Sequence, residues 1–200
     1  MSADPKTMAC YARMSDAYAE LITRTEADAD LQAFMDALPQ SDAPVLDWGC
    51  GPGNSAALMQ AQGIQAEATD ASPEMADLAR GLGIEVTVAP YDALDPAPRY
   101  RGIWANFALL HLPRDEIPAM IALAARALLP GGVLHLGMKA GEGSARDALG
   151  RFFTFVTEDE LDRWTASAGL DRLAVRHGAG NGLAGQVEPF VIHRSGKPDA

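Results

Sequence analysis

The residues that decide the fold of this chain are Val45-Leu46-Asp47-Trp48-Gly49-Cys50-Gly51-Pro52-Gly53-Asn54. Val45 and Leu46 begin a short apolar strand, and Asp47 stands shortly before three glycines at alternate positions. Glycine lets the backbone turn sharply and approach a ligand closely, because it has no Cβ. A helix is predicted from Asn54, and its first N–H groups and positive dipole end would face the same turn. A tight strand-to-helix turn alone does not need three alternating glycines after an acid, so the stretch predicts a ligand site.

Strand-like and helix-like segments alternate along the rest of the chain. Strands are predicted at residues 45–46, 64–69, 84–88, 103–107, 133–138, 173–176 and 188–193. Helices are predicted twice within residues 7–38, then at 54–62, from Pro73, at 115–128 and at 157–168, the last behind a capping box that starts at Thr157. Pro130-Gly131-Gly132 separates a helix from the fifth strand, and the glycine-rich stretch 178–185 separates the last two strands. The alternation predicts an α/β fold with a doubly wound, mostly parallel sheet, whose ligands bind beyond the carboxyl ends of the strands.

Length and charge describe one acidic globular domain. The chain has 200 residues, of which 48% are apolar and 22% are charged, and this suits a single domain with a sizeable core. Its 27 acidic side chains outnumber 16 basic ones, for a formal charge of −11. A nucleic-acid partner needs clustered basic side chains to neutralise phosphates. The sequence has no such cluster, so we expect no nucleic-acid partner.

Signals for membranes, export and metals are missing from the sequence. No apolar run approaches the roughly 20 residues that span a bilayer, and Met1–Lys6 lacks the pattern of a signal peptide. We therefore expect no membrane partner and a cytoplasmic location. Cys10 and Cys50 lack the paired spacing of a zinc site, and His177 and His193 show no ligand spacing with an acid. The sequence predicts no metal site.

A nicotinamide or flavin dinucleotide site is the main alternative for the glycine turn. Its fingerprint is G-x-G-x-x-G, but Gly53 follows Gly51 by two positions and Asn54 stands where the fingerprint has glycine. The pattern D-x-G-C-G-P-G-N at residues 47–54 instead resembles the first motif of class I S-adenosylmethionine-dependent methyltransferases. The resemblance covers roughly residues 45–170 in order. It implies a Rossmann-like fold with a seven-stranded sheet in the order 3-2-1-4-5-7-6, strand 7 being antiparallel.

The resemblance also implies which residues bind S-adenosylmethionine and its product S-adenosylhomocysteine. Asp70 stands 17 residues after Gly53, where a carboxylate can accept both ribose hydroxyls, as an acid also does in dinucleotide enzymes. In the family, residues after this acid line the adenine pocket, and the end of the fourth strand reaches the methionine part. Asp92 could contact the adenine amino group or merely cap its loop. The cofactor-binding candidates are Asp47, Gly49, Cys50, Gly51, Gly53, Asn54, Asp70, Ala71, Met75, Asp92, Ala93, Asn106 and Phe107.

In resembling enzymes an N-terminal helix that bears tyrosine closes over the cofactor. Tyr11 and Tyr18 match this feature, although Tyr18 could instead serve the amphipathic packing of its helix. A sulfonium is a cation, so the ring faces of Tyr11, Tyr18, Trp48 and Phe107 would favour it by about 1 kcal/mol each. We expect residues 1–40 to form a helical cap on a Rossmann-like core of residues 41–200, the two making one domain.

Methyl transfer from a sulfonium is an in-line displacement that needs alignment rather than a covalent protein nucleophile. A general base is needed if the acceptor must lose a proton early. His111, four residues beyond Phe107 and near the predicted cleft, is the catalytic candidate for that base or for orienting the acceptor. A structural role is the alternative for His111. His135 lies within a predicted buried strand and is expected to be structural.

The segment after the fifth strand, at about 139–156, is expected to be a mobile loop that selects the methyl acceptor. Lys139 and Arg151 could bind an anionic acceptor, while Phe152 and Phe153 could pack on its apolar part. A solvated loop tethered by salt bridges is the alternative. Because no large insertion covers the core, we expect a small-molecule acceptor.

The sequence thus predicts an S-adenosylmethionine-dependent methyltransferase (EC 2.1.1.-), monomeric or homodimeric, that acts on a small molecule by in-line displacement. Two alternatives are a catalytically silent S-adenosylmethionine-binding regulatory protein and an NAD(P)-binding oxidoreductase. The intact set Gly49, Gly51, Asp70 and Asp92, together with polar candidates on the acceptor side, favours the enzyme. The accepting atom (O, N, S or other) stays open.

Overall fold

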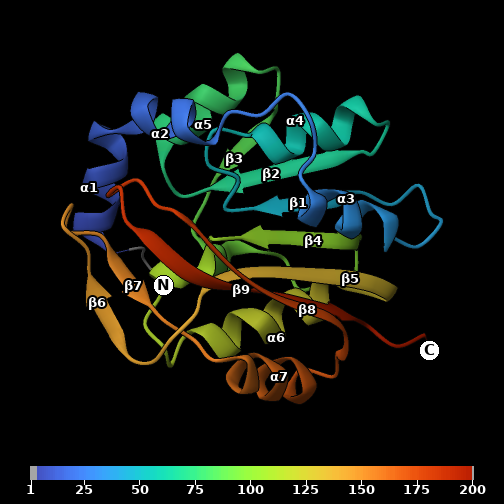
Figure 1. Cartoon of the computed structure of the whole chain (residues 1–200). Coiled ribbons are helices and arrows are strands. Elements are labelled where there is room, and N and C mark those ends of the chain that lie inside the picture. The colour runs from blue at the N-terminus through green and yellow to red at the C-terminus, as the bar shows by residue number, and fades with distance from the viewer. Residues whose placement is uncertain (1–3, 200) are drawn as a thin grey trace.

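A computed structural model describes residues 4–199, in which seven strands form one sheet (Figure 1). These strands are β1 (Val45–Trp48), β2 (Ala66–Asp70), β3 (Val86–Val88), β4 (Tyr100–Asn106), β5 (Leu128–Lys139), β8 (Asp171–Asn181) and β9 (Val187–Gly196). Their order is β3-β2-β1-β4-β5-β9-β8. β9 runs antiparallel to both of its neighbours, and the pairs from β3 to β5 are parallel. Since β8 and β9 are the sixth and seventh strands of this sheet along the chain, the predicted strand order is confirmed.

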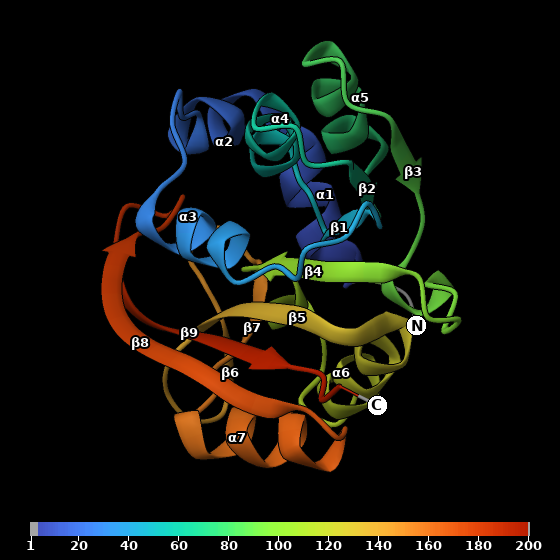
Figure 2. The ribbon, with the colours of Figure 1, turned by 90° about the vertical axis from the view of Figure 1, so that its right-hand side faces the viewer.

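Helices cover both faces of the sheet, as Figure 2 shows. On one face lie α3 (Ala29–Asp36), α4 (Asn54–Ala61) and α5 (Pro73–Gly81), and on the other lie α6 (Ile117–Ala127) and α7 (Glu158–Ser167). Successive strand residues point to opposite faces. Val45 therefore joins the core under α3, α4 and α5, and Leu46 joins the core under α6 and α7. The doubly wound α/β fold predicted from the sequence is confirmed.

The N-terminal segment lies at the edge of the sheet where β1 and β4 end (Figure 1). The prediction of two helices within residues 7–38 was wrong, because α1 (Pro5–Arg13) and α2 (Ser15–Ile22) precede α3. Side chains cap two of them: Asp4 accepts from the N–H of Thr7 at the start of α1, and Asp28 accepts from Leu31 at the start of α3. Within residues 4–199, none of the helices has the length and apolar character needed to cross a membrane.

The segment predicted as a mobile loop at 139–156 contains a small hairpin instead. Its strands are β6 (Ser144–Arg146) and β7 (Phe152–Thr154), which pair antiparallel beside α1 (Figure 1). The Phe152 N–H donates to Thr7 Oγ1 at 2.8 Å, and Arg146 forms an ion pair with Asp4 at 2.8 Å. These contacts join two segments about 140 residues apart in sequence, so local patterns could not reveal them.

Glycines in two stretches that were predicted to separate elements lie inside strands. Gly131 and Gly132 lie in β5 and exchange backbone hydrogen bonds with Lys197, at 3.0 and 2.8 Å. β8 runs through Gly178, whose missing Cβ leaves room for the ring of Phe190 on β9. The predicted break at 130–132 was therefore wrong, and the break predicted at 178–185 is confined to residues 182–186, because the glycines on the strand side of each stretch serve close packing within the sheet.

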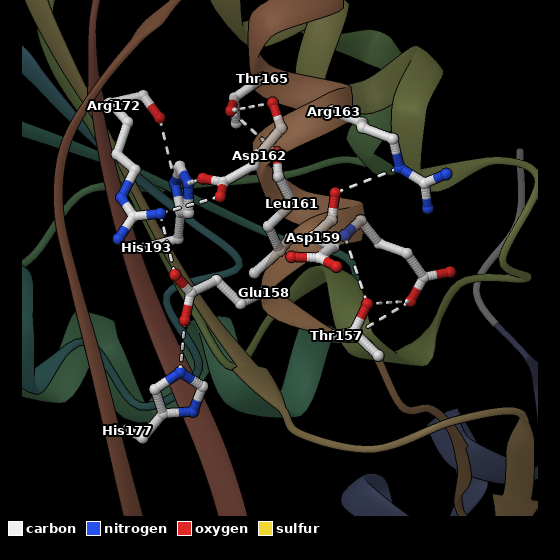
Figure 3. A network of polar contacts seen from close by, with 12 residues as sticks. Thr157, Glu158, Asp159, Leu161, Asp162, Arg163, Thr165, Arg172, His177 and His193 are labelled. Carbon is white, nitrogen blue, oxygen red and sulfur yellow. Dashed lines mark hydrogen bonds and ion pairs between the residues drawn. The ribbon is translucent and has the colours of Figure 1, made fainter.

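Polar contacts attach α7 to β8 and β9 (Figure 3). Thr157 caps this helix in the predicted capping box. Asp162 accepts from Nε2 of the buried His193 at 2.9 Å, and Ser195 Oγ lies 3.0 Å from His193 Nδ1. Arg172 bridges Glu158 and Asp162 across the same surface, as Figure 3 shows. His193 therefore has a structural role, because its side chain connects α7 to β9.

Replacing Asp162 by alanine is expected to lower the free energy of unfolding by about 1–3 kcal/mol, because His193 would lose its acceptor while buried. Urea denaturation followed by circular dichroism measures this change. The control is Asp159→Ala, an exposed residue on the same helix, which should change stability by less than about 0.5 kcal/mol. Equal effects of the two substitutions would contradict the role given to Asp162.

Candidate functional site

The glycine turn leads from β1 into α4 and has three left-handed residues. The φ angles of Gly49, Gly51 and Gly53 are 80°, 53° and 83°. A Cβ on Gly49 would lie 2.7 Å from the Cβ of Ala108, and one on Gly53 would be equally close to a side chain of α5. A Cβ on Gly51 would meet the ring of Tyr18 at 3.7 Å, which is an ordinary contact. Gly49 and Gly53 therefore allow close packing, and Gly51 lies on the side of the turn that faces the N-terminal helices.

Asp70 ends β2 beside this turn. One carboxylate oxygen accepts from the Gly51 N–H and the other from the Ser72 N–H, both at 2.8 Å. Each oxygen has a further lone pair, so the carboxylate can still accept hydrogen bonds from a ligand. Burial raises the pKa of Asp70 above its ordinary value. The residue is thus a buried acid held in a fixed orientation by two backbone donors.

Asp47 is the second acid at the turn, and it is 2% exposed. Its carboxylate accepts from the Ala56 N–H in the first turn of α4 at 3.1 Å. Burial raises the pKa of Asp47 to about 7, and the nearby charge of Asp70 acts in the same direction. A cation beside Asp47 would restore the ionised form, so this part of the site favours a positively charged ligand group.

A small cavity of about 70 Å³ lies beside the turn. A larger cavity next to it has about 580 Å³, a volume within the range of roughly 300–1,000 Å³ that small-molecule sites have. Nine of the predicted site residues line the first, smaller cavity: Tyr11, Tyr18, Gly49, Gly51, Asp70, Ala71, Met75, Phe107 and His111. They come from α1, α2, the glycine turn, the end of β2, the start of α5 and the segment after β4. The structure therefore brings together residues from six parts of the chain.

A chain of hydrogen bonds connects the N-terminal helices to the site. Nδ1 of His111 lies 2.7 Å from the carbonyl oxygen of Phe152, so this nitrogen carries the proton and donates. Nε2 then accepts from the Tyr11 hydroxyl at 2.9 Å, and that hydroxyl accepts from Arg151 at 3.2 Å. Burial lowers the pKa of His111 to about 4, so the imidazole is neutral at pH 7. Both of its nitrogens are occupied by protein groups, and a ligand reaches His111 through Tyr11.

The end of β4 supplies Asn106 and Phe107. The Asn106 side-chain oxygen lies 3.2 Å from Nε2 of His135, a buried residue that stacks on Trp104 with 3.7 Å between ring centroids. His135 thereby orients Asn106 toward the cavity, and its predicted structural role agrees with its complete burial. Phe107 has a φ of 54°, a left-handed conformation that is uncommon for a bulky residue and is found at functional sites.

The second, larger cavity adjoins the first and shares Tyr11, Tyr18, Gly49, Gly51 and Phe107 with it. Seven further predicted residues line this second cavity: Asp47, Cys50, Asn54, Asn106, Lys139, Arg151 and Phe153. The cavity extends from the glycine turn to β5, the β6–β7 hairpin and the tip of the β8–β9 hairpin. Figure 2 shows that last hairpin curling toward α3.

Several predicted residues lie outside both cavities. Gly53 is the N-cap of α4, and the ring of Phe152 lies under Arg146, with 5.6 Å from the guanidinium carbon to the ring centroid. Asp92 and Ala93 form a single 3-10 turn after β3, and neither lines the cavities beside the glycine turn. Trp48 is buried in the core against Tyr91, so its ring does not face the candidate cation site.

Comparisons with known proteins agree with this fold. Residues 45–132 match the family model described as a methyltransferase domain. The trans-aconitate 2-methyltransferase of Methylobacterium nodulans is 37% identical over 119 residues, covering 58% of this chain and 45% of that protein. The 1,6-didemethyltoxoflavin-N1-methyltransferase of Burkholderia thailandensis has a TM-score of 0.74 at 22% identity, covering 100% of this chain and 92% of that one. The resemblance to class I methyltransferases is confirmed.

The chain spans about half the length of the curated relatives it matches. A TehB-like methyltransferase from Corynebacterium glutamicum also shares the fold, with a TM-score of 0.66 at 20% identity over 97% of this chain. Within this methyltransferase fold, both cavities lie beyond the carboxyl ends of β1, β2 and β4, where doubly wound sheets bind ligands.

Sequence reasoning missed residues that approach the site from distant segments. Thr7 and Met8 of α1 line the first cavity, and Arg176, Glu188 and Phe190 of the β8–β9 hairpin line the second. No motif marks these residues, because they reach the site through the packing of elements far apart in sequence. The glycine-rich stretch before Phe190 was the available signal, and it was interpreted as a loop.

Proposed function

We propose that this chain is an S-adenosylmethionine-dependent methyltransferase that transfers a methyl group to a small molecule by in-line displacement. The observation that carries the proposal is the position of Asp70, a buried carboxylate that lines the first cavity beside the glycine turn. The second cavity adjoins the first and could hold an acceptor. Bound S-adenosylmethionine would supply an electrophilic methyl carbon on a sulfonium. We further propose that residues 1–200 act as one domain with residues 1–40 as a cap.

The residues at the turn suit an adenosyl ligand. Asp70 has lone pairs left for two ribose hydroxyls, and Ala71 and Met75 line the same cavity on the adenine side. Asp47 and Asn106, at the ends of β1 and β4, are placed for the ammonium and carboxylate of the methionine part. We leave Asp92 and Ala93 out of the proposed site, because neither lines the cavity.

Tyr11, Tyr18 and Phe107 line both cavities and are the proposed aromatic neighbours of the sulfonium. Tyr11 is also the proposed orienting group for the acceptor, because its hydroxyl donates to the neutral His111 and can accept a hydrogen bond from a protonated acceptor atom. In this proposal His111 stays neutral and acts as a positioning residue for the Tyr11 hydroxyl. The chain's main contribution is alignment of the acceptor and exclusion of water by α1 and α2.

The affinity for S-adenosylhomocysteine is expected to rise by close to tenfold between about pH 6 and pH 8. Burial raises the pKa of Asp47 to about 7, so at the lower pH most of this carboxyl is protonated and must ionise to pair with the ligand ammonium. Isothermal titration calorimetry at a series of pH values measures this change. Asp47→Asn should bind more weakly and lose most of the pH dependence. An unchanged pH profile in that variant would contradict the role of Asp47.

Transfer of label from [methyl-³H]S-adenosylmethionine to small molecules tests the activity. The acceptors are a panel of neutral aromatic phenols, ring-nitrogen compounds and trans-aconitate, each incubated with the full chain. Methylated product from at least one panel member, lost in Asp70→Ala, is the expected result. Cofactor binding without transfer to any member would favour the catalytically silent regulatory protein instead.

A further inference from the structure

We infer that the acceptor is a neutral, planar ring compound and not a polycarboxylate. This inference rests on the proposed function and concerns the second cavity. It differs from what the names of the curated relatives state, since trans-aconitate is a tricarboxylate. The basis is the distribution of charge and of aromatic side chains around that cavity.

Every basic side chain that lines this cavity, among the residues that the structure describes, is already paired with a carboxylate. Four such pairs surround the cavity: Arg24 with Asp28, Lys139 with Glu188, Arg151 with Asp147, and Arg176 with Asp30. The pair of Arg151 and Asp147 is the most buried, with side chains 4% and 8% exposed and two hydrogen bonds at 2.7 and 2.9 Å. The cations that sequence analysis assigned to an anionic acceptor are thus neutralised within the chain.

The same cations also lie against aromatic rings. The Lys139 ammonium is 3.3 Å from the centroid of Phe153, and the Arg151 guanidinium carbon is 5.0 Å from it. Burial lowers the pKa of Lys139, which further weakens it as an anion site. A polycarboxylate would have to displace Glu188 and Asp147 from their partners and would then place its own charge beside these two acids and Asp47. That arrangement disfavours several carboxylates in one ligand.

Aromatic side chains provide the remaining walls. Phe107 and Phe190 contact each other edge to face, with 5.7 Å between ring centroids, and Trp104 and Phe153 line the same cavity. Gly178 makes room for the Phe190 ring, so the β8–β9 hairpin is built to hold that ring at the cavity. Flat apolar walls beside a hydrogen-bonding Tyr11 and Asn106 suit a planar ring with one or two polar atoms.

The test uses the full chain saturated with S-adenosylhomocysteine, whose binding is first measured by calorimetry. N-phenyl-1-naphthylamine, a neutral aromatic probe, is then titrated by fluorescence, and trans-aconitate is added as a competitor at millimolar concentration. The expected result is probe binding that trans-aconitate does not reduce. Phe190→Leu should weaken probe binding about tenfold, while Val187→Ala, at an exposed position of β9 that lines neither cavity, should change it less than about twofold. The double substitution Lys139→Gln with Glu188→Gln removes both charges of one ion pair together and is used in the competition with trans-aconitate.

Displacement of the probe by trans-aconitate, with loss of that displacement in the double variant, would overturn the inference. Absence of probe binding to the loaded protein would overturn it as well. If S-adenosylhomocysteine itself does not bind, the proposed function fails in the first step, before the acceptor is tested. The two failures are therefore distinguishable.

Discussion

Asp70→Ala is expected to weaken S-adenosylhomocysteine binding by about 100-fold or more. Hydrogen bonds to a buried carboxylate contribute about 1.5–3 kcal/mol each, and two ribose hydroxyls would lose their acceptor together. The substitution also frees the N–H groups of Gly51 and Ser72, which Asp70 now orients. Calorimetric titration of the variant beside the wild type measures the loss.

Two further variants make this result specific. Asp70→Asn keeps the shape and one acceptor oxygen, so its affinity should fall between those of wild type and alanine variant. Asp77→Ala removes an exposed acid on α5, paired with Arg80, and should bind like the wild type. Circular dichroism confirms that each variant is folded. Wild-type affinity in Asp70→Ala would mean that the ribose is bound elsewhere.

Gly49→Ala is expected to lower the free energy of unfolding by about 2–5 kcal/mol and to abolish adenosyl binding. A left-handed φ of 80° costs a residue with a Cβ about 1–2 kcal/mol, and forcing atoms into a packed site adds about 1–3 kcal/mol. The new Cβ would lie 2.7 Å from the Ala108 Cβ and 2.9 Å from the Tyr91 hydroxyl oxygen. Relief of that clash would move the turn away from the ligand.

Gly63→Ala is the matched control for this substitution. Gly63 has nearly the same φ, 79°, at the end of α4, but a Cβ there would meet no atom within 4 Å among the described residues. Gly63→Ala should therefore lower the free energy of unfolding only by the backbone cost of about 1–2 kcal/mol, and ligand binding should be unchanged. Urea denaturation compares the two variants. Equal losses of stability would show that the packing of Gly49 against Ala108 is not a constraint.

Local patterns predicted much of the fold. The doubly wound sheet and the capping of α7 by Thr157 were predicted correctly from apolar runs and short-range capping signals, and the strand order was predicted correctly from the family resemblance of the glycine motif. Asp47 and Asp70 lie together beside the glycine turn because parallel strands end at one edge of the sheet, and their roles in binding stay predictions. The error at 130–132 and the misplaced start of the break at 178–185 have one cause: glycine was interpreted as a break where tertiary packing requires its small size.

Tertiary pairing explains what the sequence did not predict. Asp30 on α3 and Arg176 on β8 are 146 residues apart, and their ion pair closes one side of the second cavity. The roles of Lys139 and Arg151 also depend on partners, Glu188 and Asp147, that no spacing rule connects to an acceptor site. The sequence does not show whether a lysine or arginine is paired with a carboxylate. An unpaired one favours an anionic ligand, whereas a paired one favours a neutral ligand.

We infer that this fold binds an adenosyl cofactor at the glycine turn and not a dinucleotide. Calorimetric titration of the full chain with S-adenosylhomocysteine, and separately with NADH, tests this claim most directly. We expect saturable binding of S-adenosylhomocysteine with one site per chain and no heat of binding from NADH. Saturable binding of NADH without binding of S-adenosylhomocysteine would contradict this claim, and the proposed methyl transfer would be wrong as well.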